Sequence, residues 1–179
     1  MAISATVIKA DLNISNIDDH YYQSHHLTLA KHPSENDTRM MLRLIAFALY
    51  ASDTLEFTRG LSSDDEPELW QKNLIDDIEL WIELGQPDEK RLRKACHKAD
   101  QVVVFSYGDN ASKSWWSANQ GKLSQLKNLR VIEMDSESYE QLEQFAQRHI
   151  QLNFTMQDKT LFISDDNHSM EWSPVILQD

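Results

Sequence analysis

Hydrophobic and polar residues alternate over most of the first thirty positions. Residues 3–14 and 21–29 both show the two-residue period of strands, and a polar break at 16–20 separates them. This pattern predicts an antiparallel hairpin. His25 and His26 fall in its second strand, where consecutive side chains point to opposite faces, so we do not expect them to chelate one metal ion.

Helical spacing of apolar residues is clearest in the segment PSENDTRMMLRLIAFALYA. Ser34, with Asp37 three positions later, is typical of a helix start. The apolar positions at helical spacing are Met41, Leu42, Ile45, Ala48 and Leu49. A second helix is predicted for PDEKRLRKACHKA, with Pro87 at its first position, because acidic residues lead and cations follow.

Strand patterns occupy the chain between and after these two helices. Residues 55–60, 68–73 and 78–85 alternate or are rich in aromatics, and QVVVFSYG is a continuous apolar run. The succession of strand, helix and strand from 78 to 107 predicts a right-handed parallel crossover. Residues 34–107 thus follow the order α, β, β, β, α, β.

The last third of the chain continues the mixture of helices and strands. The pattern predicts a helix at 112–123, a strand at 128–134, a helix at 136–149 and a hairpin of 151–157 with 160–164. The final segment, 164–179, has weak periodicity. We expect a partly loose tail there, anchored by Trp172.

Length and composition indicate one domain. A chain of 179 residues has the size of a single domain, and four Gly and four Pro leave no flexible linker. We find no internal repeat. The predicted fold is mixed α/β: a single compact domain over 1–179, with a central mixed sheet, the core at 34–107, and β-hairpins near both ends.

Charge and cysteine content narrow the classes of function. The net charge of −12 argues against a protein that coats DNA or RNA, although a local basic face is compatible with it. No 18-residue apolar run exists, which excludes a membrane-spanning helix. The N-terminus does not resemble a secretory signal, and Cys96 is the single cysteine, so we expect a cytoplasmic protein.

Two candidate strands, 68–73 and 78–85, are separated by a break of hairpin length. If Asn73 stands opposite Ile78, the opposed pairs are Lys72 with Glu79, Trp70 with Trp81, and Glu68 with Glu83. Opposed carboxylates repel unless a cation lies between them or one is protonated. Mg²⁺ suits such a pair. The alternative is a register shifted by one residue, or glutamates that splay into solvent.

Longer strings of the chain resemble a known family. They are ISATVIKADLNISNIDDHYY, HPSENDTRMMLRLIAFALYA, LSSDDEPELWQKNL, IELWIELGQPDEKRLRKACHKADQVVVFSYG and the later WW pair. These strings look like the YaeQ family of bacterial proteins, over nearly the whole chain. The resemblance implies a compact fold built around a variation of the PD-(D/E)XK nuclease motif, which is similar to the element order inferred above.

The nuclease motif implied by this resemblance departs from the usual pattern. Pro67 and Glu68 occupy its PD position, with Glu in place of Asp, and Glu83-Leu84-Gly85 occupies its (D/E)XK position. Gly85 stands where the motif has its lysine. The ammonium that would polarise the phosphate or activate water is therefore missing from that position.

A replacement cation is expected from the following helix. Arg91, Lys94 and Lys98 are spaced i, i+3 and i+7 and share one face, with Lys94 the first candidate. Gln86 would supply a neutral amide instead. The alternative is a solvated helix with cations near its carboxyl end.

A third metal-facing acid is also implied by the resemblance. Glu35, near the start of the long helix, falls where many nucleases of this fold carry such a residue, although glutamates are common at helix starts.

Trp115 and Trp116 could stack bases, but we favour a place over the core, since their surroundings are not basic. Cys96, beside His97 on a helix, is also expected in the core.

Two functions from different classes follow. The first is Mg²⁺-dependent phosphodiester hydrolysis, with Glu68 and Glu83 on the metal and Lys94 or Gln86 completing the site. The second is a catalytically inactive nuclease-like scaffold that binds a nucleic acid or a protein partner as a regulatory protein. A third possibility is that Glu68 and Glu83 have a purely structural role, which leaves the function unknown.

Overall fold

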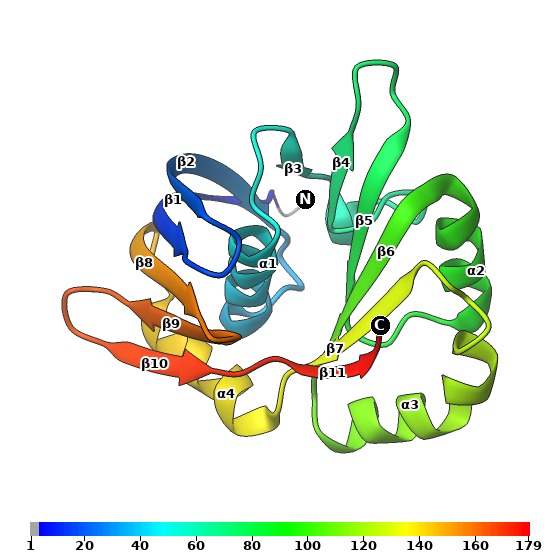
Figure 1. The fold of residues 1–179 in the computed structure, drawn as a ribbon. Coiled ribbons are helices and arrows are strands. Elements are labelled where there is room, and N and C mark those ends of the chain that lie inside the picture. Colours follow the sequence, from blue (N-terminus) through cyan, green and yellow to red (C-terminus); the bar gives the residue numbers. More distant parts are fainter. Residues whose placement is uncertain (1–3) are drawn as a thin grey trace. The chain divides into compact units, whose positions relative to one another are not determined.

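The computed structural model describes residues 4–179, which form two compact units. The first unit comprises the described residues up to Ala51 together with Glu137–Pro174. The second comprises Ser52–Ser136 and Val175–Asp179. Each unit contains one mixed sheet and its own helices (Figure 1).

The first unit is built on a five-stranded sheet in the order β10-β9-β8-β1-β2. Its strands are β1 (Thr6–Asn16), β2 (Tyr21–Lys31), β8 (His149–Gln157), β9 (Thr160–Ser164) and β10 (Ser169–Trp172). The two predicted hairpins are confirmed, since β1 pairs with β2 and β8 with β9, both antiparallel. A parallel pairing of β1 with β8 joins them into one sheet.

Helix α1 (Asp37–Leu49) belongs to the same unit and packs near β1 and the short helix η2 (Leu142–Phe145). Its predicted apolar residues are buried except Leu49, which is half-buried, and the helix begins later than Ser34 indicated. Asn36 caps it, because its side chain accepts a hydrogen bond from the Arg39 amide. The predicted helix at 136–149 is shorter too: α4 (Ser136–Gln141) passes into η2.

The second unit contains a six-stranded sheet in the order β11-β7-β6-β5-β4-β3. Its strands are β3 (Leu55–Phe57), β4 (Leu69–Lys72), β5 (Ile78–Leu84), β6 (Ala99–Ser106), β7 (Leu129–Glu133) and β11 (Val175–Gln178). The central strands β5, β6 and β7 are parallel, and β5 and β6 are joined through helix α2, as predicted. The remaining pairs are antiparallel.

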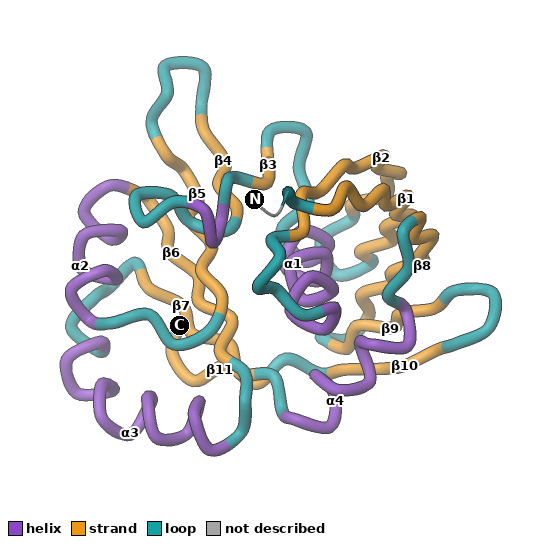
Figure 2. Tube along the Cα trace, turned by 180° about the vertical axis from the view of Figure 1, so that it is seen from behind, coloured by secondary structure: helices purple, strands orange, loops and turns teal. Residues whose placement is uncertain are grey.

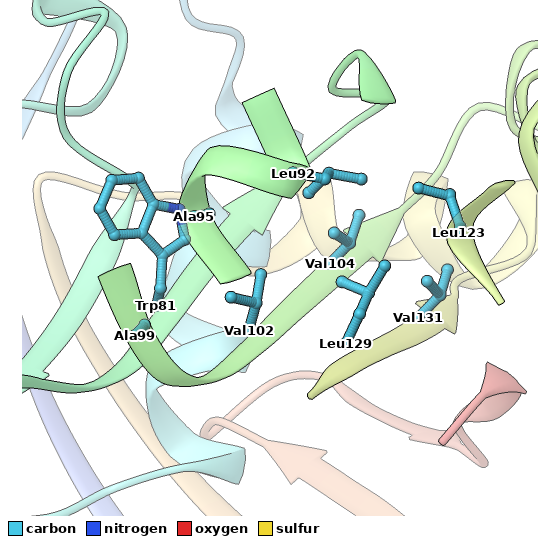
Figure 3. Close-up of a cluster of buried hydrophobic side chains, with 9 residues drawn as sticks. All are labelled: Trp81, Leu92, Ala95, Ala99, Val102, Val104, Leu123, Leu129 and Val131. Carbon is cyan, nitrogen blue, oxygen red and sulfur yellow. The ribbon is translucent and has the colours of Figure 1, made fainter. Parts of the chain in front are cut away.

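Helices α2 (Glu89–Lys98) and α3 (Asn110–Leu123) lie along one side of this sheet (Figure 2). Helix α2 begins after Asp88, whose side chain accepts from the Arg91 amide, so Pro87 precedes the cap and is not the first helical residue. Between helices and sheet lies a buried apolar cluster of Trp81, Leu92, Ala95, Ala99, Val102, Val104, Leu123, Leu129 and Val131 (Figure 3). Trp115 and Trp116 pack against it, which confirms their predicted place over the core.

The C-terminal segment is ordered, so the prediction of a partly loose tail is wrong. Residues 169–172 form β10, where Met170 and Trp172 are buried, and β11 pairs antiparallel with β7. Both strands find partners remote in sequence, and periodicity within 16 residues cannot indicate such pairing.

The fold class is mixed α/β, as predicted. The difference lies in the sheets, because the terminal hairpins form a sheet of their own instead of extending a central one. The element order α, β, β, β, α, β is present from α1 to β6, apart from the short helix η1 (Gly60–Ser62). One domain over 1–179 stays a prediction. No helix of the described chain has the length and apolar content to cross a membrane.

Candidate functional site

The centre of the β4–β5 hairpin has the predicted register, with Trp70 opposite Trp81 and Leu69 opposite Ile82. The pairing does not extend to Glu68 and Glu83, because Glu68 lies in a bend just before β4. The Glu68 amide donates to the carbonyl of Ile82 at 2.9 Å, which holds Glu68 next to the carboxyl end of β5. At the other end of the hairpin, a bulge sets Lys72 opposite Ile78 instead of Glu79.

Glu83 is buried, with 5% of its surface exposed. Its Oε1 atom accepts two hydrogen bonds, from Arg91 Nε and from Trp81 Nε1, each at 2.8 Å. No described residue donates a hydrogen bond to its other oxygen, Oε2. Burial raises the pKa of Glu83 above its ordinary value of 4.5; Arg91 and Trp81 oppose this, and the charge of Glu68 adds to it.

Glu68 is equally buried, and its position depends on a glycine. Gly60 has φ +48°, and a Cβ atom on it would lie 2.7 Å from Glu68 Oε2. Any other residue would therefore displace the carboxylate and also strain the backbone. The loop before β4 is thus shaped around the Glu68 side chain.

Arg91 links helix α2 to this loop as well as to Glu83. Its guanidinium donates to the carbonyl of Asp64 at 2.5 Å and to that of Glu66 at 2.8 Å. The spacing of Arg91, Lys94 and Lys98 predicted a basic helix face. Lys94 was the first candidate on it for the cation that replaces the missing motif lysine. In the structure Arg91 is the cation that contacts Glu83. Its position one turn before Lys94 on the same face was the signal for it.

A cleft of about 370 Å³ opens beside this cluster, and we call it the α2 cleft. Its lining residues are Asp64, Asp65, Trp81, Asp88, Lys90, Arg91, Lys94, Ala95 and Lys98. Trp81 and Arg91, the two hydrogen-bond donors to Glu83, thus also line the cleft. Lys90 and Lys94 form no ion pair with residues 4–179. The cleft therefore presents free ammonium groups next to the buried carboxylates.

Gln86 points to a different part of the second unit. Its side-chain amide donates to the carbonyl of Tyr107 and, at 3.4 Å, to the hydroxyl of Ser106. Both acceptors lie at the carboxyl end of β6. Gln86 makes no hydrogen bond to Glu68 or Glu83, so the structure does not bring it into the carboxylate cluster.

Glu35 belongs to the first unit and is also buried. Its Oε1 accepts from Arg39 at 2.9 Å and its Oε2 from Arg43 at 2.7 Å. Both oxygens are therefore engaged by guanidinium groups. The metal role that resemblance implied for Glu35 stays a prediction.

Three other side chains, Cys96, His25 and His26, have ordinary structural roles. Cys96 is half-buried, and burial raises the pKa of its thiol to about 11, so it stays protonated near neutral pH. His25 and His26 are separated as predicted: His25 contacts Tyr21 and Phe47, whereas His26 bonds to Asp11.

The chemistry open to the cluster is that of a two-carboxylate site. No group of three or more His, Cys, Asp or Glu that could hold a metal occurs within residues 4–179. Mg²⁺ does not need such a group, because it keeps several waters and is often bound by one or two carboxylates with substrate phosphate. Glu68 and Glu83 are carboxylates of the kind that such a site uses, and their metal role stays a prediction.

Known proteins match this chain over almost its full length. The uncharacterized protein YaeQ of Escherichia coli (strain K12) is 46% identical over 171 residues, covering 96% of this chain and 94% of that protein. The crystal structure of YaeQ from Xanthomonas axonopodis pv. citri superposes with a TM-score of 0.95 at 47% identity, covering 98% and 99% of the two chains.

A structure with lower sequence identity has the same fold. YaeQ from Pseudomonas syringae gives a TM-score of 0.93 at 33% identity, covering 98% of this chain and 97% of that one. The family model described as YaeQ protein matches residues 1–174. The chain therefore belongs to the YaeQ family.

Proposed function

We propose that the second unit is a Mg²⁺-dependent phosphodiesterase with a degenerate nuclease motif. The observation that carries this proposal is the pair of buried carboxylates, Glu68 and Glu83, beside a cleft lined by Lys90 and Lys94, which form no ion pair within residues 4–179. The charge of Glu68 acts on Glu83, and Oε2 of Glu83 accepts no hydrogen bond from a described residue, so this oxygen is available to a divalent cation. The ion would supply electrophilic stabilisation of a phosphate and an activated water.

The residues of this chain have separate tasks in the proposal. Glu68 and Glu83 hold the ion, and Gly60 leaves the space that Glu68 needs. Lys94, whose ammonium faces the α2 cleft without an ion pair, stabilises charge on the phosphate in place of the lysine missing at Gly85. Arg91 fixes Glu83 and the loop at 64–66.

Calorimetric titration with Mn²⁺ and Mg²⁺ tests the premise. We expect one bound ion per chain, with at least a tenfold loss of affinity in both Glu68→Gln and Glu83→Gln. Glu79→Gln is the matched control: this glutamate lies on the same strand but accepts a hydrogen bond from Gln71. Equal affinity in wild type and Glu83→Gln would remove the premise.

Protons compete with the metal for Glu83. Because burial raises the pKa of this carboxyl, affinity should increase with pH through the range above 4.5. Hydrolysis is then assayed on single- and double-stranded DNA and RNA. We expect Lys94→Met to retain metal binding and lose most of the turnover, whereas Gln86→Ala leaves turnover unchanged.

A second function is favoured by one contact, the ion pair of Arg91 with Glu83. In this alternative the guanidinium takes the place of the metal, and the unit is an inactive nuclease-like scaffold that binds a nucleic acid or protein through the α2 cleft. It predicts binding without a metal requirement and no cleavage. Metal binding with no hydrolysis of any nucleic acid tested would also favour it.

A further inference from the structure

Every nitrogen of the Arg91 guanidinium is used within the second unit. Its Nε atom donates to Glu83 Oε1 at 2.8 Å. Its Nη1 atom donates to the carbonyl of Asp64 at 2.5 Å, and its Nη2 atom to that of Glu66 at 2.8 Å. Both carbonyls belong to residues 59–66, which lie between β3 and β4 and which we call the acidic loop. One side chain thus ties this loop to a buried carboxylate.

The acidic loop has little else to hold it in place. Its remaining hydrogen bonds join residues 58–66 to one another. Among the described residues 4–179, Arg91 is the one outside this range that hydrogen-bonds to the loop. Packing adds little, because Leu61, the large apolar side chain of the loop, is 46% exposed. Loss of the Arg91 contacts would therefore leave the loop without a hydrogen-bonded attachment.

The acidic loop also sets the charge of the α2 cleft. Asp64 and Asp65 line the cleft, as does Asp88 at the helix cap. The cations of the lining are Lys90, Arg91, Lys94 and Lys98. Three carboxylates thus face four cations and nearly cancel them. If the loop moved away with its two aspartates, one carboxylate would face the same four cations, and such a basic surface favours phosphate.

Arg91 lies where a metal ion on Glu83 would repel it. The guanidinium now pairs with Glu83, and a divalent ion on Glu68 and Glu83 would balance both negative charges by itself. Arg91 would then be a surplus positive charge next to the ion, and like charges repel strongly where water is excluded. The Arg91 side chain is 29% exposed and lines the α2 cleft, so it can turn into solvent without repacking the core.

We propose that Arg91 is a latch, that a divalent ion on Glu68 and Glu83 releases it, and that this release withdraws the acidic loop from the α2 cleft. In the latched state the guanidinium supplies the positive charge beside Glu83, and the loop carboxylates screen the lysines of the cleft. Binding of the ion expels Arg91, frees the loop carbonyls and leaves the cleft basic. The inference rests on the proposed metal site and adds its regulation: the cleft admits phosphate once the metal is bound.

Hydrogen–deuterium exchange of the full chain, with and without Mn²⁺, tests the latch with no substitution. We expect peptides that cover residues 59–66 to exchange at least about fivefold faster with Mn²⁺. The Glu83→Gln protein is the control, because Mn²⁺ attached loosely to the loop acids would act on it equally, and its loop should not respond. Mn²⁺ binding that leaves loop exchange in wild type unchanged or slower would overturn the latch and retain the metal site.

Calorimetric titration of Arg91→Met provides a second test. Without the competing guanidinium, Mn²⁺ should bind at least about tenfold more tightly than it does to wild type. A residue that only supports the site would give weaker binding when removed. Arg93→Met is the matched control: this arginine lies on the same helix, pairs with Glu89 and should leave the affinity unchanged.

Arg91→Lys separates the two tasks of the latch. Lysine keeps the positive charge, but its single ammonium cannot span the carboxylate and both loop carbonyls as the planar guanidinium does. We expect metal affinity close to that of wild type, together with fast exchange of the acidic loop before any metal is added. Loop exchange as slow as in wild type would contradict the role given to the fork of Arg91.

The titrations also distinguish failure of the latch from failure of the proposed function. Mn²⁺ bound by Arg91→Met and not measurably by wild type would support both. Equal affinity in the two proteins would retain the metal site and exclude the latch. No binding to either protein would remove the metal site and the latch with it.

The charge of the cleft is tested in metal-free buffer with a fluorescein-labelled DNA of about ten nucleotides. Asp64→Asn with Asp65→Asn imitates withdrawal of the loop and should bind this DNA at least about fivefold more tightly than wild type. Asp76→Asn with Asp77→Asn removes the same charge from the exposed turn between β4 and β5 and is the matched control. Equal gains in the two double variants would show that net charge alone acts, which would exclude screening by the loop.

Discussion

Each of the two units buries carboxylate charge, and the units differ in how that charge is balanced. In the first unit, one oxygen of Glu35 accepts from Arg39 and the other from Arg43. In the second, the charge of Glu68 acts on Glu83, and the Oε1 atom of Glu83 accepts from both Arg91 and Trp81. The first arrangement is typical of a structural ion pair, whereas the second retains acceptor capacity for a cation.

The comparison explains why burial alone does not identify a functional carboxylate. Glu35, Glu68 and Glu83 are all nearly inaccessible, at 5%, 6% and 5% exposure. What distinguishes the second unit is the interaction of two buried acids with each other and the neighbouring cleft, in which Lys90 and Lys94 form no ion pair within residues 4–179. A buried carboxylate with both oxygens in ion pairs stabilises a conformation, whereas Glu83 keeps one oxygen that accepts no hydrogen bond from a described residue.

Removing the charge of Glu35 should produce the largest change in stability. Glu35→Gln leaves the buried Arg43 without its anion, and we expect the free energy of unfolding to fall by about 3–5 kcal/mol. Urea unfolding followed by circular dichroism measures it. Glu143→Gln, at an exposed position of the same unit, is the control and should change little. A loss of less than about 1 kcal/mol would show that the cluster is not a structural ion pair.

Removing Arg91 should have the next largest effect. Arg91→Met breaks one ion pair and two bonds to loop carbonyls, so we expect a loss of roughly 2 kcal/mol. If the metal proposal holds, Mg²⁺ recovers part of this loss, because binding to the folded state stabilises it. Arg93→Met, which breaks an exposed pair with Glu89, should cost under about 0.5 kcal/mol and show no Mg²⁺ response.

Glu83→Gln should change the pH dependence of stability more than its magnitude. The pKa of Glu83 is raised in the folded state, so the unfolded chain loses this proton first as pH rises above about 4.5. Stability contributed by the protonated group is therefore lost as pH rises from 4.5 through the folded pKa. In metal-free buffer, the Glu83→Gln variant should lack this decline in stability with pH. Identical curves of unfolding free energy against pH for wild type and variant would contradict this expectation.

Asp11 is the exposed counterpart of the buried Glu83. Its substitution should have the smallest effect on stability. Hydrogen bonds from His26, at 2.6 Å, and His149, at 2.7 Å, lower the pKa of its carboxyl. The contribution is present above the unfolded pKa near 3.8 and is lost as pH falls through the folded pKa. Asp11→Asn should lower stability slightly at neutral pH, where this contribution is present, and leave it unchanged at pH values below the folded pKa, so that this portion of acid unfolding disappears. NMR titration of the Asp11 carboxyl carbon measures its pKa directly.

Local patterns predicted most of the elements of the fold and one essential part of the site. Alternation located the β4–β5 hairpin, and the length of its break gave the pairing of Trp70 with Trp81. The pairing of Glu68 with Glu83 was not predictable in the same way, because Glu68 lies in a bend before β4. The role of Arg91 was missed because three cations share one helix face, and spacing cannot tell which one reaches the carboxylate. The need for glycine at position 60 was missed because it depends on a contact with Glu68, which forms only in the folded structure.

The sequence by itself determined most of the strands and helices before residue 165 and their apolar faces, because those properties depend on residues a few positions apart. Only the tertiary structure decided that β1 pairs with β8, that β11 pairs with β7, and that Arg91 contacts Glu83. These contacts join residues from 8 to more than 130 positions apart. Their free energy arises from packing and burial, which no local period records.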